Sequence, residues 1–161
     1  YNRLQTDIIR KISTRKEIWA DIGAKDIETI TDAFIAGANK IVISTKTLGT
    51  VELIEEAVDI SNKIIFGIDY KNGIISPSEG LKKKKIEDLV DLALEYDIDD
   101  IVVCDLSGNR FDQNLIKYLP NEGYNLYIAG GIEGKDEGLY PDNVDGVILG
   151  LREAVEWKQR N

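Results

Sequence analysis

The sequence contains no histidine and no methionine, and its single cysteine is Cys104. Without histidine, imidazole acid–base catalysis and His-ligated metal sites are excluded within this chain. One cysteine cannot form an intrachain disulfide, and such a composition is typical of the reducing cytoplasm, where we expect the protein to act. Because methionine is missing even at the first position, we interpret the sequence as part of a longer protein.

Long apolar runs are also missing, since no segment approaches the roughly 20 residues that span a bilayer. The start of the chain shows no signal-peptide pattern. The formal net charge of -9 argues against nucleic acid and anionic membranes as partners. A phosphate bound by this protein must therefore be held by local dipoles, because the overall charge repels it.

Six short apolar runs alternate with helical patterns along the chain. We predict strands at about 17–21, 40–45, 64–69, 100–105, 124–129 and 145–149. Helical spacing predicts helices near 7–13, 25–37, 51–61 and 85–97, weaker ones near 114–119 and 135–139, and a last one from Arg152. Strands that are apolar on both faces are typical of a parallel sheet covered by helices. No linker divides them, so we expect one domain over residues 1–161.

The chain also contains a weak internal repeat. "WADIGAKD" (19–26) followed by "NKIVIST" resembles "YIAGGIEGKD" (127–136) followed by "VDGVILG". The offset is about four β/α units, which is half of an eightfold barrel, and it predicts a (β/α)₈ TIM barrel. On that interpretation the chain supplies strands three to eight, and strands one and two precede Tyr1. An open sheet of the flavodoxin type is the alternative.

Two adjacent glycines, Gly130 and Gly131, follow the fifth predicted strand, and Gly150 ends the sixth. In β/α barrels a phosphate site commonly lies beyond the last two strands. Glycine lets backbone N–H groups face an anion closely, and the helix that follows adds a positive dipole end. The three glycines therefore predict a phosphate-binding site, although a tight elbow without a ligand would also explain the pair.

The order of "WADIGAKDIETITDAFIAGANKIVIST", "GIDYKNG", "IVVCDLSG", "YIAGGI" and "VDGVILGLREA" resembles the histidine-biosynthesis barrels of the ribulose-phosphate-binding type, which are ProFAR isomerase and its sister cyclase. The resemblance covers essentially the whole chain. It implies an Amadori-type isomerisation of a substrate with a phosphate at each end, with no cofactor and no metal, and with two aspartates as acid and base. It implies a catalytic role for Asp69 and phosphate binding by Gly130, Gly131 and Gly150.

Other positions depart from the pattern of that family. Its glycine-rich elbow after strand three reads Asp21-Ile22-Gly23 here, and the glycine that ends strand four is Ser44. A carboxylate about 4 Å from a phosphate costs roughly 4 kcal/mol at an effective dielectric constant of 20. We therefore expect the phosphate site of the N-terminal half to be lost, and the ligand to carry one phosphate.

Asp21, Asp69 and Asp105 each end a predicted strand, so three carboxylates could ring one mouth of the barrel. We consider all three as candidate catalytic residues. They could also bind Mg²⁺, raise one another's pKa, or cap helices. Asp69 has a further alternative, because Asn72-Gly73 predicts a tight turn that the aspartate could merely steady.

Four other features are weaker. The run Lys82–Lys85 is expected to be a solvated face, Cys104 an inert residue of an apolar strand, and Arg110 a possible clamp for an anion. Lys46 follows a strand and is the one candidate for Schiff-base chemistry. The first interpretation is thus an isomerase acting on a phosphorylated small molecule. A lyase or aldolase-like barrel, or a barrel that only binds a phosphometabolite, remains open.

Overall fold

The computed structural model describes residues 2–108, 110–120, 122–133 and 140–160. Six parallel strands form one sheet, and each predicted strand is confirmed with small shifts at its ends. The strands are β1 (Trp19–Ala20), β2 (Lys40–Ser44), β3 (Ile64–Tyr70), β4 (Asp100–Asp105), β5 (Asn125–Ala129) and β6 (Gly146–Ile148). They lie side by side in chain order, β1-β2-β3-β4-β5-β6.

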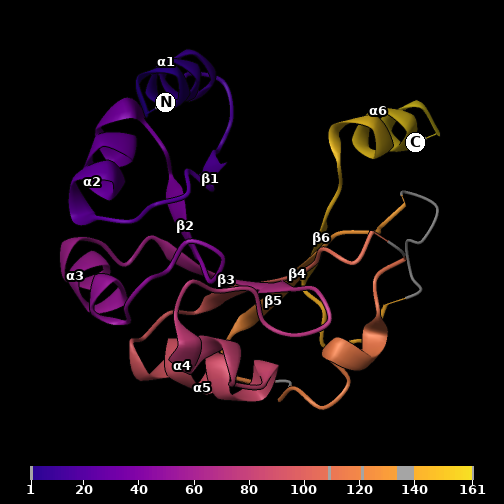
Figure 1. Cartoon of the computed structure of the whole chain (residues 1–161). Coiled ribbons are helices and arrows are strands. Elements are labelled where there is room, and N and C mark those ends of the chain that lie inside the picture. The colour runs from indigo at the N-terminus through magenta and orange to yellow at the C-terminus, as the bar shows by residue number, and fades with distance from the viewer. Residues whose placement is uncertain (1, 109, 121, 134–139, 161) are drawn as a thin grey trace.

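This strand order decides between the two predicted architectures. A flavodoxin-type sheet reverses its order at a switch point, whereas here every strand pairs with its neighbour in the chain. The sheet curls strongly, with the first and last strands on opposite arms (Figure 1). The fold is therefore a curled parallel α/β sheet of the kind found in part of a (β/α)₈ barrel. Within the described residues, β1 and β6 pair with β2 and β5 only.

Most helices lie on the convex side of the curl, whereas the last one stands apart from the sheet (Figure 1). The helices are α1 (Asn2–Ile12), α2 (Ile27–Ala36), α3 (Glu52–Ile60), α4 (Glu79–Lys82), α5 (Ile86–Glu95) and α6 (Leu151–Arg160). None of the described helices is long and apolar enough to cross a membrane. The predicted helices at 25–37, 51–61, 85–97 and from Arg152 are confirmed.

Three helix predictions need comment. The first helix begins at Asn2, five residues before the predicted start, and the connection after β3 contains the short α4, which was not predicted. The predicted helix at 114–119 is wrong, since the chain forms only a 3₁₀ turn at Gln113–Leu115. The predicted helix at 135–139 lies outside the described residues.

Helix α2 shows how the sequence sets element boundaries. The Asp26 carboxylate accepts a hydrogen bond from the Thr29 backbone N–H at 2.8 Å, which satisfies a free donor at the start of the helix. At the other end Gly37 adopts φ +106°, and a Cβ there would lie 2.6 Å from the Ser13 Oγ. Gly37 is thus both the left-handed cap and the point where α1 and α2 approach closely.

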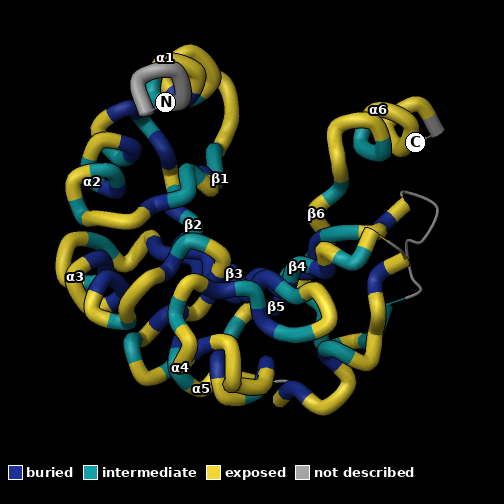
Figure 2. Tube along the Cα trace, viewed as in Figure 1, coloured by how far each residue is buried: buried dark blue, intermediate teal, exposed yellow. Residues whose placement is uncertain are grey.

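Side-chain alternation divides the sheet into two apolar surfaces. Ile64, Phe66 and Ile68 of β3 belong to the main core between the sheet and its helices, whereas Ile65 belongs to a smaller cluster with Val102. Because successive residues of a strand point to opposite faces, the smaller cluster lies on the concave side. Buried residues accordingly follow the strands, while α6 and the run Lys82–Lys85 are largely exposed (Figure 2).

Candidate active site

The candidate residues lie where the strands end. Asp21 follows β1, Asp69 is the penultimate residue of β3, Gly130 follows β5 and Gly150 lies two residues beyond β6. Because all six strands are parallel, these positions share the C-terminal edge of the sheet. This is the edge at which β/α barrels place their chemistry.

Asp69 is a buried carboxylate that is held from the end of β2. The Ser44 hydroxyl donates a hydrogen bond to its Oδ2, and the Lys46 backbone N–H donates to the same oxygen at 3.3 Å. The Lys46 ammonium lies 3.6 Å from Oδ1, and the Asp69 side chain is only 3% exposed. Such a group is fixed in position and has limited access to bulk water.

The turn after Asp69 was the alternative explanation for this residue. Asn72 and Gly73 adopt positive φ values of 56° and 141°, so the predicted turn is confirmed. Asp69 contributes to it through its backbone, whose carbonyl accepts a hydrogen bond from the Ile75 N–H at 2.8 Å. The carboxylate itself bonds to β2 and Lys46. Steadying the turn therefore does not explain why the side chain is an acid.

Lys46 joins Asp69 to Asp21. Its ammonium lies 2.6 Å from Asp21 Oδ2, with both side chains a little more than one-third exposed. Burial alone lowers the pKa of Lys46, but the hydrogen bond to Asp21 and the charges of Asp21 and Asp69 outweigh it, so the pKa lies above its usual value. Sequence reasoning missed this pairing, because Asp21 and Lys46 follow different strands and meet only once β1 and β2 lie side by side.

Cys104 lies beside Asp69, because the register of β3 and β4 pairs these two residues. Burial, with a further contribution from the Asp69 charge, raises the pKa of the thiol to about 11. The thiol is therefore protonated at neutral pH, when it is a weak nucleophile. This agrees with the inert role expected for Cys104.

Asp105 does not join the other two carboxylates. Along β4, Asp105 lies two residues after Val103 and four after Ile101, so its side chain points to the same face as theirs. Both of these residues belong to the main core, and the Asp105 side chain therefore leaves the sheet on the helix-covered face. Its carboxylate accepts hydrogen bonds from the backbone N–H groups of Ser107 at 2.9 Å and Asp112 at 3.1 Å. The expected ring of three aspartates is thus reduced to Asp21 and Asp69. Across the described parts of the chain, no group of three or more acidic or thiol side chains could hold a metal ion.

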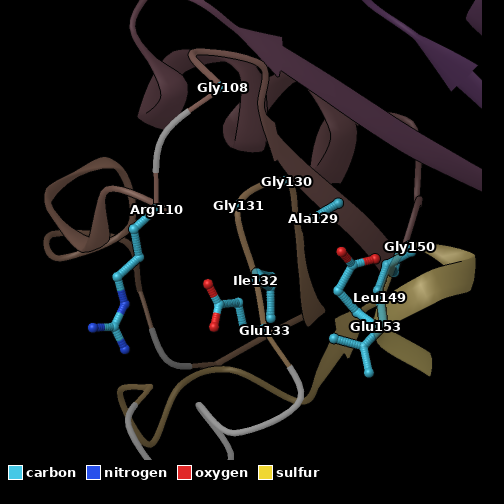
Figure 3. A pocket seen from close by; sticks show the side chains of 11 residues that line it. Gly108, Arg110, Ala129, Gly130, Gly131, Ile132, Glu133, Leu149, Gly150 and Glu153 are labelled. Atoms are coloured by element: carbon cyan, nitrogen blue, oxygen red, sulfur yellow. The ribbon is translucent and has the colours of Figure 1, made fainter. Parts of the chain in front are cut away.

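A cavity of about 630 Å³ opens among the glycines predicted to bind phosphate (Figure 3). It is lined by Gly108, Arg110, Ala129, Gly130, Gly131, Ile132, Glu133, Ile148, Leu149, Gly150 and Glu153. Gly130 and Gly131 adopt φ values of 88° and 63°. The structure thus brings Gly130, Gly131 and Gly150 to one cavity, and Arg110 lies across that cavity from Gly150 (Figure 3).

Packing of the backbone requires one of these glycines, Gly130, but not the other, Gly150. A Cβ on Gly130 would lie 2.0 Å from the Asp105 carbonyl oxygen, so this glycine is needed for the approach of β5 to β4 whether or not a ligand binds. A Cβ on Gly150 would lie 2.5 Å from Glu153 Oε2, which belongs to the first turn of α6. A carboxylate therefore stands at the helix end where an anion is expected.

A second, smaller cavity of about 380 Å³ lies beside the Asp21–Lys46 pair. It is lined by Lys25, Lys46, Thr47, Gly49, Thr50, Leu53 and Pro77. Two ammonium groups and two hydroxyl groups make its wall suitable for an anion. The sequence analysis expected the phosphate site of the N-terminal half to be lost because of the Asp21 charge. That expectation treated the charge as unpaired, whereas Asp21 pairs with Lys46 beside this cavity.

Curated relatives share most of this chain. A protein of Lachnoclostridium phytofermentans is 29% identical over 156 residues, which cover 89% of this chain and 64% of the relative. One from Clostridium kluyveri is 27% identical over 173 residues, covering 93% and 72%. One from Bacillus cereus is 28% identical over 157 residues, covering 89% and 65%. The chain thus spans about two-thirds of their length. All three are named as isomerases of an imidazole-4-carboxamide with two 5-phosphoribosyl groups.

The family comparison agrees with the resemblance noted in the sequence. A family model described as "Histidine biosynthesis protein" matches residues 2–151, nearly the whole chain. That range includes all six strands and every site residue predicted from the sequence. The chain therefore belongs to the histidine biosynthesis protein family.

Proposed function

We propose that the protein is an aldose–ketose isomerase that performs an Amadori-type rearrangement on a phosphorylated aminosugar. The observation that carries the proposal is the buried Asp69 carboxylate at the C-terminal edge of the sheet, where one cavity is lined by glycines, Arg110 and two glutamates and another by two lysines. The names of the relatives, which specify two phosphoribosyl groups, support the same substrate class. The proposed location is the cytoplasm.

The reaction moves one proton between neighbouring carbon atoms. Protonation of the ring oxygen, with the lone pair of the C1 nitrogen, opens the sugar to an iminium ion, and loss of the proton at C2 gives an enolamine. Return of a proton to C1, with loss of the proton of the C2 hydroxyl, then gives the aminoketose. No electrons are exchanged with another reactant, so the step needs an acid, a base and a fixed substrate. We assign Asp69 as the acid or base of this chain, and we give Asp21 and Asp105 supporting roles through Lys46 and the loop after β4.

The phosphate groups anchor the substrate on either side of Asp69. One would bind at Gly130, Gly131 and Gly150, with Arg110 as an added positive charge. Adjacent parallel strands lie about 4.8 Å apart, so β5 is roughly 10 Å from β3, which is a suitable span for half of an extended bisphosphate. Lys25 with Thr47 and Thr50 offers a second anchor. Because Lys46 offsets part of the Asp21 charge and Lys25 adds a second ammonium group, we favour a two-phosphate substrate over the single-phosphate ligand expected from the sequence.

We also propose that two further β/α units complete the sheet to an eight-stranded barrel. The edges of β1 and β6 that face away from β2 and β5 supply the hydrogen-bonding groups that such units need. In the finished barrel the concave cluster around Ile65 and Val102 would become the filled interior.

The test is turnover of the bisphosphorylated aminoaldose by the full-length protein, followed by separation of aldose and ketose. Conversion that is lost in Asp69→Asn supports the proposal. Binding of sugar monophosphates without any conversion of the bisphosphate would contradict it and favour a barrel with other chemistry. A Schiff-base mechanism is disfavoured, because the ion pairs of Lys46 keep its amine protonated.

A further inference from the structure

Lys46 lies between two carboxylates that come from different strands. Its ammonium is 2.6 Å from Asp21 Oδ2 and 3.6 Å from Asp69 Oδ1. The same residue also donates its backbone N–H to Asp69 Oδ2. Lys46 therefore contacts both oxygens of the Asp69 carboxylate, one through its backbone and the other through its side chain.

The surroundings of Asp69 explain why such a partner is needed. A carboxylate that is 3% exposed loses most of its hydration, and only hydrogen bonds and a nearby positive charge can offset that loss. Ser44 supplies a hydrogen bond, and Lys46 supplies the charge. Lysine is long and flexible, so its position must itself be fixed, and the shorter contact to Asp21 does this.

We propose that Lys46 is a positioning residue that holds the Asp69 carboxylate in place and oriented for proton transfer, while Asp21 acts by holding Lys46. The inference rests on the proposed function, since it gives Lys46 a role in turnover only if Asp69 exchanges protons with the substrate. It also suggests why an aspartate is tolerated beside a cavity lined by lysines, because Lys46 offsets part of its charge.

Cys104 provides a readout that does not depend on turnover. It is the single cysteine of the chain, it is partly exposed, and it lies in register with Asp69. The Asp69 charge raises the pKa of its thiol and the Lys46 charge lowers it, with smaller upward contributions from Asp105 and Asp21. The rate of alkylation by iodoacetamide at a fixed pH follows the thiolate fraction, so it reports the charges around Asp69.

The experiment compares Lys46→Met, Lys46→Arg, Asp21→Asn and Asp69→Asn in the full-length protein. Alkylation at pH 9 should slow at least about threefold in Lys46→Met, which corresponds to half a pKa unit, and quicken in Asp69→Asn. In turnover, Lys46→Met should lower kcat at least about tenfold with a smaller change in KM, and Lys46→Arg should recover much of the loss. Asp21→Asn should lower kcat less than Lys46→Met does.

The matched control is Lys40→Met. Lys40 is also a paired lysine, but it begins β2, whereas Lys46 follows the end of that strand, and it contacts Asp100. Its removal should leave both the alkylation rate of Cys104 and kcat close to native. A change in Cys104 reactivity equal to that of Lys46→Met would indicate a general loosening of the sheet and would overturn the inference.

The outcomes separate this inference from the proposed function. An unchanged alkylation rate in Lys46→Met, or a rise in KM at constant kcat, overturns the positioning role and leaves Lys46 as an anion ligand. The variants could shift the alkylation rate as expected while the native protein converts no aminoaldose. That result supports the charge coupling and contradicts only the proposed function. If Lys46→Met fails to fold, the double variant with Asp69→Asn should restore folding, because no buried carboxylate then lacks its partner; failure to do so overturns the inference.

Discussion

Each end of the sheet holds a lysine–aspartate ion pair, and the two pairs differ in what surrounds them. At the N-terminal end Lys40 pairs with Asp100, whose other oxygen accepts a hydrogen bond from the Asn125 side chain at 2.9 Å. Lys40 also lies 4.9 Å from the centre of the Trp19 ring. At the C-terminal end one lysine, Lys46, is shared by two carboxylates and borders a cavity.

The difference concerns charge and space. The Lys40–Asp100 pair is electrically balanced and its polar atoms are bonded to neighbouring strands, so it can do little beyond holding β2, β4 and β5 in register. The Lys46 group carries one surplus negative charge and lies next to open volume. A barrel can therefore keep stability at one edge and chemistry at the other, as the general behaviour of this fold leads one to expect.

The largest expected effect is on kcat, and it is tested by replacing one aspartate with asparagine at each end of the sheet. Asp69→Asn should lower kcat by about 10²- to 10⁴-fold, because an amide cannot exchange the proton, while Ser44 can still bond to it. Asp100→Asn should leave kcat near native and lower the free energy of unfolding by about 1–3 kcal/mol, because its charge-assisted bond to Lys40 is lost. Steady-state kinetics and urea unfolding of both variants check this, and a large loss of kcat in Asp100→Asn would break the comparison.

The next effect separates packing from ligand binding at the C-terminal edge. Gly130→Ala should destabilise the protein by about 3–5 kcal/mol, because its Cβ would overlap the Asp105 carbonyl at 2.0 Å. Gly73→Ala is the control, since φ there is +141° but no atom lies within 4 Å, and it should cost about 1–3 kcal/mol. If urea unfolding showed the same loss in the free energy of unfolding for both variants, β5 would be able to move away from β4.

A smaller effect is expected at the helix end beside Gly150. Glu153→Gln removes a negative charge from the wall of the glycine cavity, so inorganic phosphate should bind about threefold to tenfold more tightly. Titration calorimetry at low salt measures this. Glu156→Gln, on the same helix but outside the cavity lining, is the control, and an equal gain there would indicate only a change in net charge.

A further effect is a pH dependence that arises beside Asp69. Because the pKa of Cys104 rises from 9.0 to about 11 on folding, the folded protein keeps a proton that the unfolded chain releases. Stability is then fully present below pH 9 and falls as the pH rises from 9 to 11. The midpoint temperature of thermal unfolding should therefore fall more steeply between pH 9 and 11 in the native protein than in Cys104→Ala. Parallel curves would show that the thiol titrates alike in both states.

The sequence by itself determined the elements and their order. Apolar runs of five or so residues, bounded by polar and glycine positions, marked all six strands, and the capping of α2 by Asp26 and Gly37 can be explained from neighbouring residues. The glycines of the larger cavity could be predicted as a group because each follows a strand, and parallel strands end at one edge. The weak helix predicted at 114–119 is wrong, since only Gln113–Leu115 form a 3₁₀ turn, although Ile116 and Leu119 are buried as a helical pattern would have them.

Only the tertiary structure decided which charges meet. Asp21, Asp69 and Asp105 look alike in the sequence. In the sheet, however, Asp69 is in register with Cys104 and not with Asp105, so these two carboxylates leave opposite faces. Asp105 points toward the helices, whereas Asp69 bonds to the end of β2. The pairing of Asp21 with Lys46 joins residues 25 positions apart, and no local pattern encodes it. Ion pairs depend on distances of a few ångströms between side chains from different strands, and these distances are set only when the sheet has curled and its strands are in register.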